Sequence, residues 1–344
     1  MAGERPDWRY AIRGLRVNVF RPESEGRYPV IMCAHPYGKD RLPKRGPLGY
    51  RPQPQYRGTR HSVTFSAWTS WEAPDPAYWV PRGNVVVNCD LRGFGTSEGR
   101  GNLLTEAEAQ DIYDLIEWAG TQSWSNGKVG MNGVSYLAIS QYKVAALRPP
   151  HLSAICPWEG LSDVYRYFAR PGGICNDGFI RLWSAGVKRG GRPSEDIREE
   201  QIARPLRDEW WAARTPEPQR IEVPMLVCGS FSDQELHTRG SFCAFERVGS
   251  PHRWLYTHRG AKLATYYCEE ALTFQRRFLD HFLKGEENGM LEVPPCAWRS
   301  ARTATRSKRC ETRRRGRCRK RAGRTFTCTR TGVSSTRRWP IPRW

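Results

Sequence analysis

The segment from residue 128 to 146, KVGMNGVSYLAISQYKVAA, constrains the fold more than any other part of the chain. Residues 129–132 predict a short buried strand, residues 133–135 a sharp turn, and the apolar spacing from Tyr136 onward a helix. A serine at the tip of such a turn holds its hydroxyl above the sheet. The N–H groups after it belong to a helix N-terminus, which favours negative charge. The segment therefore indicates an acyl-transfer nucleophile at Ser135.

Apolar strands alternate with helical stretches along most of the chain. Strands are predicted at 16–20, 28–34, 84–90, 152–156, 223–228 and 252–257, and helices at 105–120 and 265–284. Residues 41–70 show little periodicity and are expected to be irregular. This alternation favours an α/β fold with a mostly parallel sheet flanked by helices. Ligands of such sheets bind at the carboxyl ends of the strands.

We expect this core to be interrupted once. Residues 1–158 form its first part, residues 159–222, rich in Arg, Trp and Tyr, a helical cap insertion, and residues 223–295 its second part. Residues 296–344 hold 17 Lys and Arg against one acid and almost no aliphatic side chains. They are therefore expected to be a disordered basic tail, which carries +16 of the net charge of +20.

Composition excludes several classes of protein. There is no apolar run of about 18 residues to cross a membrane and no apolar signal core. Seven cysteines before residue 295 stand singly, without CxxC spacing, which favours free thiols in a reducing cytoplasm over disulfides. We see no cluster of metal ligands, and the Gly-rich loop at 90–99 lacks the GxGxxG spacing. Neither a metal nor a cofactor is expected.

A nucleophilic serine needs a base and an acid. In the α/β-hydrolase arrangement these follow the serine in the order acid, then histidine, each after a late strand. Asp233 and His258 occupy those positions, with Glu235 as a nearby rival acid. The imidazole accepts the serine proton and the carboxylate fixes its tautomer.

Six other histidines compete with His258 for the role of base. They are His35, which could itself line the site, and His61, His151, His237, His252 and His281. His258 is preferred on its position after a late strand. His237 is only four residues from Asp233, which is too local for an acid and a base on two separate loops. The backbone N–H of Tyr136 is the expected first oxyanion donor. Tyr37, after an early strand, offers a hydroxyl as the second, or is simply the middle residue of a Pro-Tyr-Gly turn.

The chain from about residue 16 to 295 resembles the CocE/NonD acyl hydrolases, the cocaine-esterase-like relatives of Xaa-Pro dipeptidyl-peptidases in peptidase family S15. The resemblance rests on six motifs, namely HPYGKD at 35–40, DLRGFGTSEG at 90–99, GVSYLA at 133–138, GSFSDQELHTRG at 229–240, YTHRG at 256–260 and DHFLKG at 280–285. It implies a serine hydrolase with an α/β-hydrolase core, a helical cap and a C-terminal jelly-roll domain.

The same resemblance implies roles for individual residues. Ser135 is the nucleophile, Asp233 the acid and His258 the base, and Tyr37 and the backbone of Tyr136 donate to the oxyanion. The substrate would be a small ester or a short peptide. We favour an esterase over a dipeptidyl-peptidase because the sequence identifies no carboxylate to bind an N-terminal amine.

The family's jelly roll is expected to be absent here, because the Arg-rich composition after Pro295 is that of GC-rich coding DNA translated out of frame. A contrasting hypothesis is an inactive truncated remnant whose basic tail associates with nucleic acid. We do not favour nucleic acid as a partner, and a membrane is not expected. The oligomeric state stays open.

Overall fold

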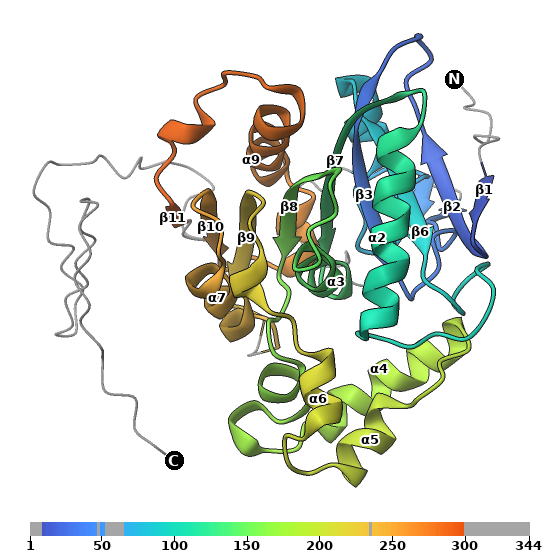
Figure 1. The fold of residues 1–344 in the computed structure, drawn as a ribbon, viewed down its shortest axis with the longest axis vertical. Coiled ribbons are helices and arrows are strands. Elements are labelled where there is room, and N and C mark those ends of the chain that lie inside the picture. Colours follow the sequence, from blue (N-terminus) through green and yellow to red (C-terminus); the bar gives the residue numbers. More distant parts are fainter. Residues whose placement is uncertain (1–8, 47–48, 52–64, 234–235, 299–344) are drawn as a thin grey trace, which may run out of the picture. The chain divides into compact units, whose positions relative to one another are not determined.

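The computed structural model describes residues 9–46, 49–51, 65–233 and 236–298 of the 344-residue chain. Nine strands form one sheet in the order β1-β2-β6-β3-β7-β8-β9-β10-β11 (Figure 1). Their bounds are β1 Arg9–Ile12, β2 Leu15–Phe20, β3 Tyr28–His35, β6 Val85–Asp90, β7 Ser125–Val134, β8 Leu152–Trp158, β9 Met225–Ser230, β10 Arg253–His258 and β11 Cys296–Trp298. The strands from β6 to β11 in this order are parallel, whereas β2 is antiparallel to both of its neighbours, β1 and β6. The predicted α/β class with a mostly parallel sheet is confirmed.

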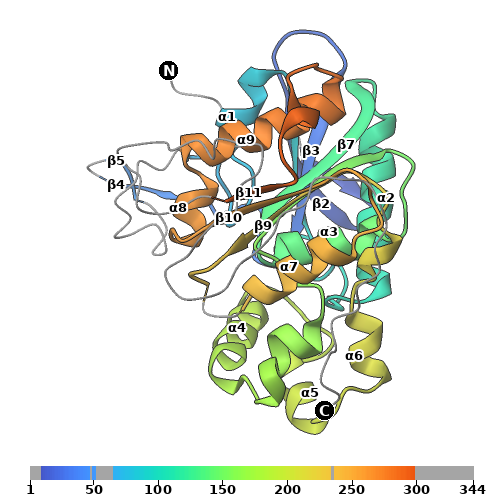
Figure 2. The same cartoon turned by 90° about the vertical axis from the view of Figure 1, so that its left-hand side faces the viewer.

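Helices cover both faces of the sheet (Figure 2). They are α1 Pro76–Trp79, α2 Glu106–Thr121, α3 Tyr136–Ala145, α4 Asp177–Gly190, α5 Ile197–Ala203, α6 Glu209–Arg214, α7 Thr238–Arg247, α8 Lys262–Tyr266 and α9 Glu269–Leu279. Shorter 3₁₀ turns occur at Val80–Arg82, Pro171–Gly173, Pro218–Arg220 and Met290–Glu292, and π turns at Tyr165–Ala169 and Asp280–Lys284. None of the helices in this part of the chain has the length and apolar character needed to span a bilayer.

Two apolar clusters fill the two sides of the sheet. One joins β-strand side chains to α2, α3 and α7, through residues such as Ile112, Leu137 and Ala244. The other joins them to α1, α8 and α9, through residues such as Trp79 and Phe278. Strands buried on both faces read as continuous apolar runs, which is why their existence could be predicted from sequence.

The helices between β8 and β9 lie together beyond the carboxyl ends of the strands (Figure 1). α4 turns an amphipathic face inward, with Ile180, Ser184 and Val187 buried. After α4, two backbone bridges, Phe94 to Gly191 and Gly101 to Pro193, fasten the chain to the Gly-rich loop that follows β6. The cap is thereby fixed to the edge of the sheet at which ligands are expected.

Three predicted elements differ from the structure. The irregular stretch 41–70 contains a small antiparallel pair, β4 Lys44–Gly46 and β5 Gly49–Arg51. The single helix predicted at 265–284 is divided, because the backbone at Cys268 is extended and a new helix starts with Glu269 and Glu270 in its first turn. The sheet also continues through Cys296–Trp298, which we had assigned to the tail. The rest of the predicted tail lies outside the described residues.

Candidate active site

Ser135 lies at the turn between β7 and α3, as predicted. Its backbone is strained, with φ 60° and ψ −116°, a conformation that costs a non-glycine residue roughly 1–3 kcal/mol and clusters at functional sites. Hydrogen bonds hold it there: Ser135 N donates to the Trp158 carbonyl at 3.0 Å, and the N–H groups of Ala138 and Ile139 donate to the Ser135 carbonyl. The hydroxyl is therefore presented by a fixed backbone.

His237 is the histidine in contact with this serine. Its Nε2 lies 3.1 Å from Ser135 Oγ, and its Nδ1 contacts Asp233 Oδ2. The backbone N–H of His237 donates to the same carboxylate oxygen at 3.0 Å. The three side chains form a continuous hydrogen-bonded chain from hydroxyl to imidazole to carboxylate, with the Nε2 nitrogen facing the hydroxyl, as acyl transfer requires.

His258, which the sequence and the family resemblance assign as the base, contacts a different acid in the structure. His258 Nε2 lies 2.8 Å from Glu159 Oε1, both side chains are buried, and the imidazole stacks on Trp158. Glu159 follows β8 directly and places its carboxyl group in the interior, where His258 is its hydrogen-bond partner. No hydrogen bond joins His258 to Ser135 or Asp233 in the structure.

The short distance in sequence between Asp233 and His237 does not keep their side chains apart. The Leu236 N–H donates to the Asp233 carbonyl at 3.1 Å, and the His237 N–H donates to the Asp233 carboxylate at 3.0 Å. The aspartate and histidine side chains can therefore meet within one loop.

Electrostatics put both groups in the protonation states that a base and its acid need. Burial lowers the pKa of His237, and the Lys262 ammonium lowers it further, against the opposing pull of Asp233. Burial alone would raise the pKa of Asp233, but the charge and hydrogen bonds of His237, together with Lys262 at 3.6 Å, bring it to about 2. At neutral pH the imidazole is neutral and the carboxylate ionised.

Tyr37 and Tyr136 lie beside the serine, as the oxyanion hypothesis requires. Tyr136 is the first residue of α3, and its phenol donates to Glu108 Oε2 at 2.6 Å, which fixes the side chain. The Tyr37 ring packs edge-on against the Tyr136 ring, with centroids 6.3 Å apart. The Tyr37 oxygen accepts a hydrogen bond from Trp183 Nε1 at 3.0 Å.

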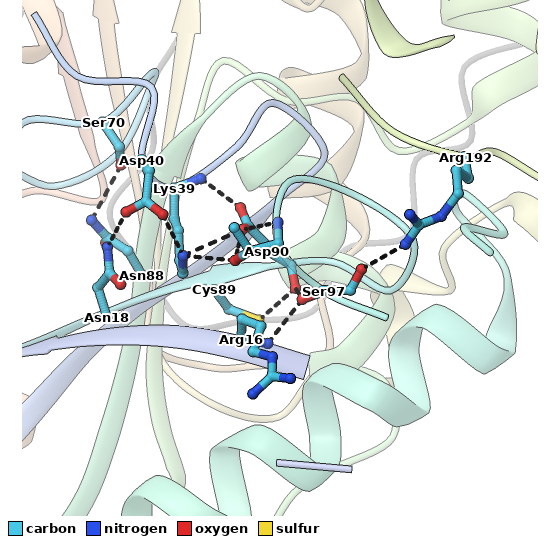
Figure 3. Close-up of polar contacts among 11 residues, drawn as sticks. Arg16, Asn18, Lys39, Asp40, Ser70, Asn88, Cys89, Asp90, Ser97 and Arg192 are labelled. Atoms are coloured by element: carbon cyan, nitrogen blue, oxygen red, sulfur yellow. Dashed lines mark hydrogen bonds and ion pairs between the residues drawn. The ribbon is translucent and has the colours of Figure 1, made fainter. Parts of the chain in front are cut away.

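The loop that carries Tyr37 is held by a buried polar network (Figure 3). Lys39 Nζ lies 3.5 Å from Asp90 Oδ2 and donates to Thr96 Oγ1 at 2.9 Å, and the Lys39 side chain is only 1 % exposed. The Thr96 backbone N–H donates to Asp90 at 2.9 Å, and Asp40 accepts from both Lys39 and Asn18. The network joins the ends of β3 and β6.

A cavity of about 860 Å³ opens over the serine. Aromatic and aliphatic side chains of the core and the cap supply most of its wall, among them Tyr37, Trp71, Tyr136, Ile139, Phe168, Phe179, Leu182 and Trp183. Arg41, Glu72, Arg189 and Lys262 are its charged members. A largely apolar wall with a few polar groups is the usual form of a small-molecule site.

Glu72 is a lining residue that the sequence did not suggest. It is 6 % exposed, and its Oε2 has no hydrogen-bond partner among the described residues. Burial raises its pKa to about 7, although Lys262 opposes the shift. Its carbonyl accepts the Val134 N–H at 3.1 Å, which places the residue beside the elbow.

One group in the described chain has the composition of a metal site. Ligand atoms of Glu159, Cys228 and His258 lie within 4.8 Å of one another, all buried. The sequence pattern does not reveal it, because its members lie on or next to three different strands. The hydrogen bond between Glu159 and His258 accounts for their approach, and burial raises the pKa of the Cys228 thiol, so we assign no metal to it.

The chain is similar to known hydrolases and peptidases. The family model for X-Pro dipeptidyl-peptidases (S15 family) matches residues 13–192. The chain is 26% identical to the cocaine esterase of Rhodococcus sp. (strain MB1 Bresler), over 81% of this chain and 54% of that protein. It is 24% identical to a putative Xaa-Pro dipeptidyl-peptidase of Bacillus cereus, over 63% of this chain and 42% of that one.

A solved structure is similar over the same region. The crystal structure of a CocE/NonD family hydrolase from Staphylococcus aureus superposes with a TM-score of 0.78 at 41% sequence identity, covering 85% of this chain and 52% of that one. The chain thus spans about half the length of the relatives that it matches.

Proposed function

Because the chain belongs to the S15 family of X-Pro dipeptidyl-peptidases, we propose that it is a serine hydrolase that cleaves carboxylic esters through an acyl-enzyme. The observation that carries this proposal is the hydrogen-bonded chain from Ser135 Oγ through His237 to Asp233. Serine is a weak nucleophile until a neighbouring base takes its proton.

The geometry supports a sequence of steps. Ser135 Oγ attacks the ester carbonyl while His237 Nε2 takes its proton, and Asp233 stabilises the imidazolium that forms. The negative oxygen of the tetrahedral intermediate accepts hydrogen bonds from the Tyr136 N–H and the Tyr37 hydroxyl. His237 then gives its proton to the leaving alcohol, and water hydrolyses the acyl-enzyme by the same steps in reverse order.

The cavity wall indicates the class of substrate. Its size and its aromatic side chains suit a small ester with an apolar or aromatic group. We further propose that the protein works in the cytoplasm, which its eight described cysteines, all free, support.

A second candidate function is that of a dipeptidyl-peptidase, which releases Xaa-Pro dipeptides from the N-terminus of peptides. We favoured an esterase partly because no carboxylate could be named for a substrate amine, and Glu72 now provides one in the cavity wall. The test is a direct comparison of p-nitrophenyl butyrate with a glycyl-prolyl p-nitroanilide. A ratio of kcat/KM that favours the anilide would make the peptidase the better description.

The first experiment on the proposed function is hydrolysis of p-nitrophenyl butyrate by the full chain beside its Ser135→Ala variant. We expect turnover in the parent chain and loss of that turnover in the variant, with unchanged circular dichroism. Turnover that survives the substitution, or a folded parent chain without turnover on either substrate, would contradict the proposal.

A further inference from the structure

Trp183 connects the cap to the predicted oxyanion site. It lies on α4, and its Nε1 donates a hydrogen bond of 3.0 Å to the Tyr37 hydroxyl oxygen. An indole N–H can only donate, so the Tyr37 oxygen must be the acceptor in this contact. The residue joined to Tyr37 thus comes from the insertion between β8 and β9.

This contact decides what the Tyr37 proton can do. A phenol has one hydrogen to donate and lone pairs to accept with. Because Trp183 occupies an accepting site, the proton of Tyr37 remains for an acceptor in the cavity that both residues share with Ser135. The contact with Trp183 is the only hydrogen bond of this hydroxyl that the described residues provide.

The same contact strengthens Tyr37 as a donor. A hydroxyl that accepts a hydrogen bond becomes polarised and donates more strongly in turn. Burial raises the pKa of Tyr37, and the charge of Glu72 adds to this, whereas the hydrogen bond from Trp183 works in the opposite direction. Trp183 therefore favours the build-up of negative charge on and near the Tyr37 oxygen.

The indole itself is held in place by its neighbours. Its ring stacks on Tyr136, with centroids 6.2 Å apart and planes inclined by 19°. Phe168 packs edge-on against the same ring, with centroids 5.2 Å apart. Trp183 thus contacts both Tyr37 and Tyr136, the two residues whose donors are assigned to the oxyanion. These contacts fix the position of the indole relative to both donors.

We propose that Trp183 is a positioning residue, which aims the Tyr37 hydroxyl at the oxyanion so that the cap helix α4 completes the oxyanion hole. This inference rests on the proposed function, since it needs an oxyanion to form at Ser135. A cap aromatic that merely lined the cavity would contribute to binding instead, and its loss would raise KM while leaving kcat unchanged.

The test is Trp183→Phe, which removes the N–H and keeps an aromatic ring. We expect kcat for p-nitrophenyl butyrate to fall about tenfold, less than the 10²–10³-fold that loss of a whole oxyanion donor costs, with KM changed less than twofold. Trp210→Phe is the matched control, because Trp210 lies on α6, outside the cavity wall. It should leave both constants within twofold.

A double-mutant cycle with Tyr37→Phe distinguishes positioning from a separate effect. If Trp183 acts through Tyr37, Trp183→Phe should change kcat less than twofold once the Tyr37 hydroxyl is gone. A full tenfold loss in the Tyr37→Phe background would overturn the inference, and so would a rise in KM alone.

An isosteric replacement guards against a change in packing. Benzothienylalanine at position 183 keeps the shape of the indole but carries sulfur in place of N–H, so it should reproduce the fall in kcat without lowering Tm. Parent-like kcat with the isostere would refute the inference. Failure of the proposed function looks different, because the parent chain itself would then show no turnover that depends on Ser135.

Discussion

Replacing Lys39 tests whether the buried network beneath Tyr37 stabilises the fold. Lys39→Met removes an ammonium whose side chain is 1 % exposed and leaves the Asp90 carboxylate, equally buried, without its cation. Three donors to Asp90 remain, from the Lys39 N–H, the Thr96 N–H and the Thr96 hydroxyl, at 2.5, 2.9 and 3.0 Å. Removing one partner of a buried pair costs roughly 3–5 kcal/mol. The remaining hydrogen bonds place our expectation at the lower end, about 3 kcal/mol.

Urea unfolding followed by circular dichroism measures this loss. Lys128→Met, at an exposed lysine, is the control and should change the free energy of unfolding by less than about 0.5 kcal/mol. Lys39→Met with Asp90→Asn should recover part of the loss, because no uncompensated charge then stays buried. A loss below about 1 kcal/mol in Lys39→Met would refute the reasoning that this pair anchors the loop.

Two further predictions concern the pH profile and the Gly-rich loop. Catalysis needs neutral His237, so its lowered pKa predicts that the rise of kcat/KM with pH is centred below pH 6.5. Lys262→Met should move this rise to higher pH in a pH–rate profile, and a rise centred above pH 6.5 in the parent would contradict the assignment. Gly95→Ala should destabilise the fold by at least about 2 kcal/mol, since φ is +52° and the new Cβ would lie 2.3 Å from Asp90 Oδ2. Gly83→Ala, with φ +73° and open space around it, should cost only about 1 kcal/mol in the same urea-unfolding measurement, and equal losses would refute the argument.

The elbow could be predicted from sequence because its signal is local. A strand, a tight turn and a helix within 19 residues specify both the fold class and the exposed position of Ser135. Tyr37 and Asp233 could be placed for a related reason, since each comes directly after a buried strand and such strand ends meet at one edge of the sheet. The structure brings these three residues to the same site.

Choosing the histidine needed tertiary information. Both His237 and His258 follow late strands, and the sequence contains nothing to show that Glu159 is buried opposite His258. The preference for His258 rests on the order of the late strands, whereas in the structure His237 lies within hydrogen-bonding distance of Ser135. The sequence alone does not show that Glu159 is a buried acid that needs a histidine as its hydrogen-bond partner.

The contact between the cap and Tyr37 could not be predicted from the sequence, for a different reason. Trp183 is one of 14 tryptophans in the chain, and its spacing on α4 is that of any helix with a buried face. Its contact with Tyr37 spans 146 positions of sequence. Such long-range contacts depend on how the cap folds back over the sheet, which the helical pattern of the cap does not specify.

The most direct test of the account compares His237→Gln with His258→Gln in pre-steady-state hydrolysis of p-nitrophenyl butyrate. Glutamine at 258 can still donate to Glu159, so that variant should fold and keep acylation within about tenfold of the parent chain. His237→Gln should lose acylation by on the order of 10⁴-fold or more, as expected for the base of a triad. The reverse result, with His258 essential and His237 dispensable in folded variants, would contradict the site described above.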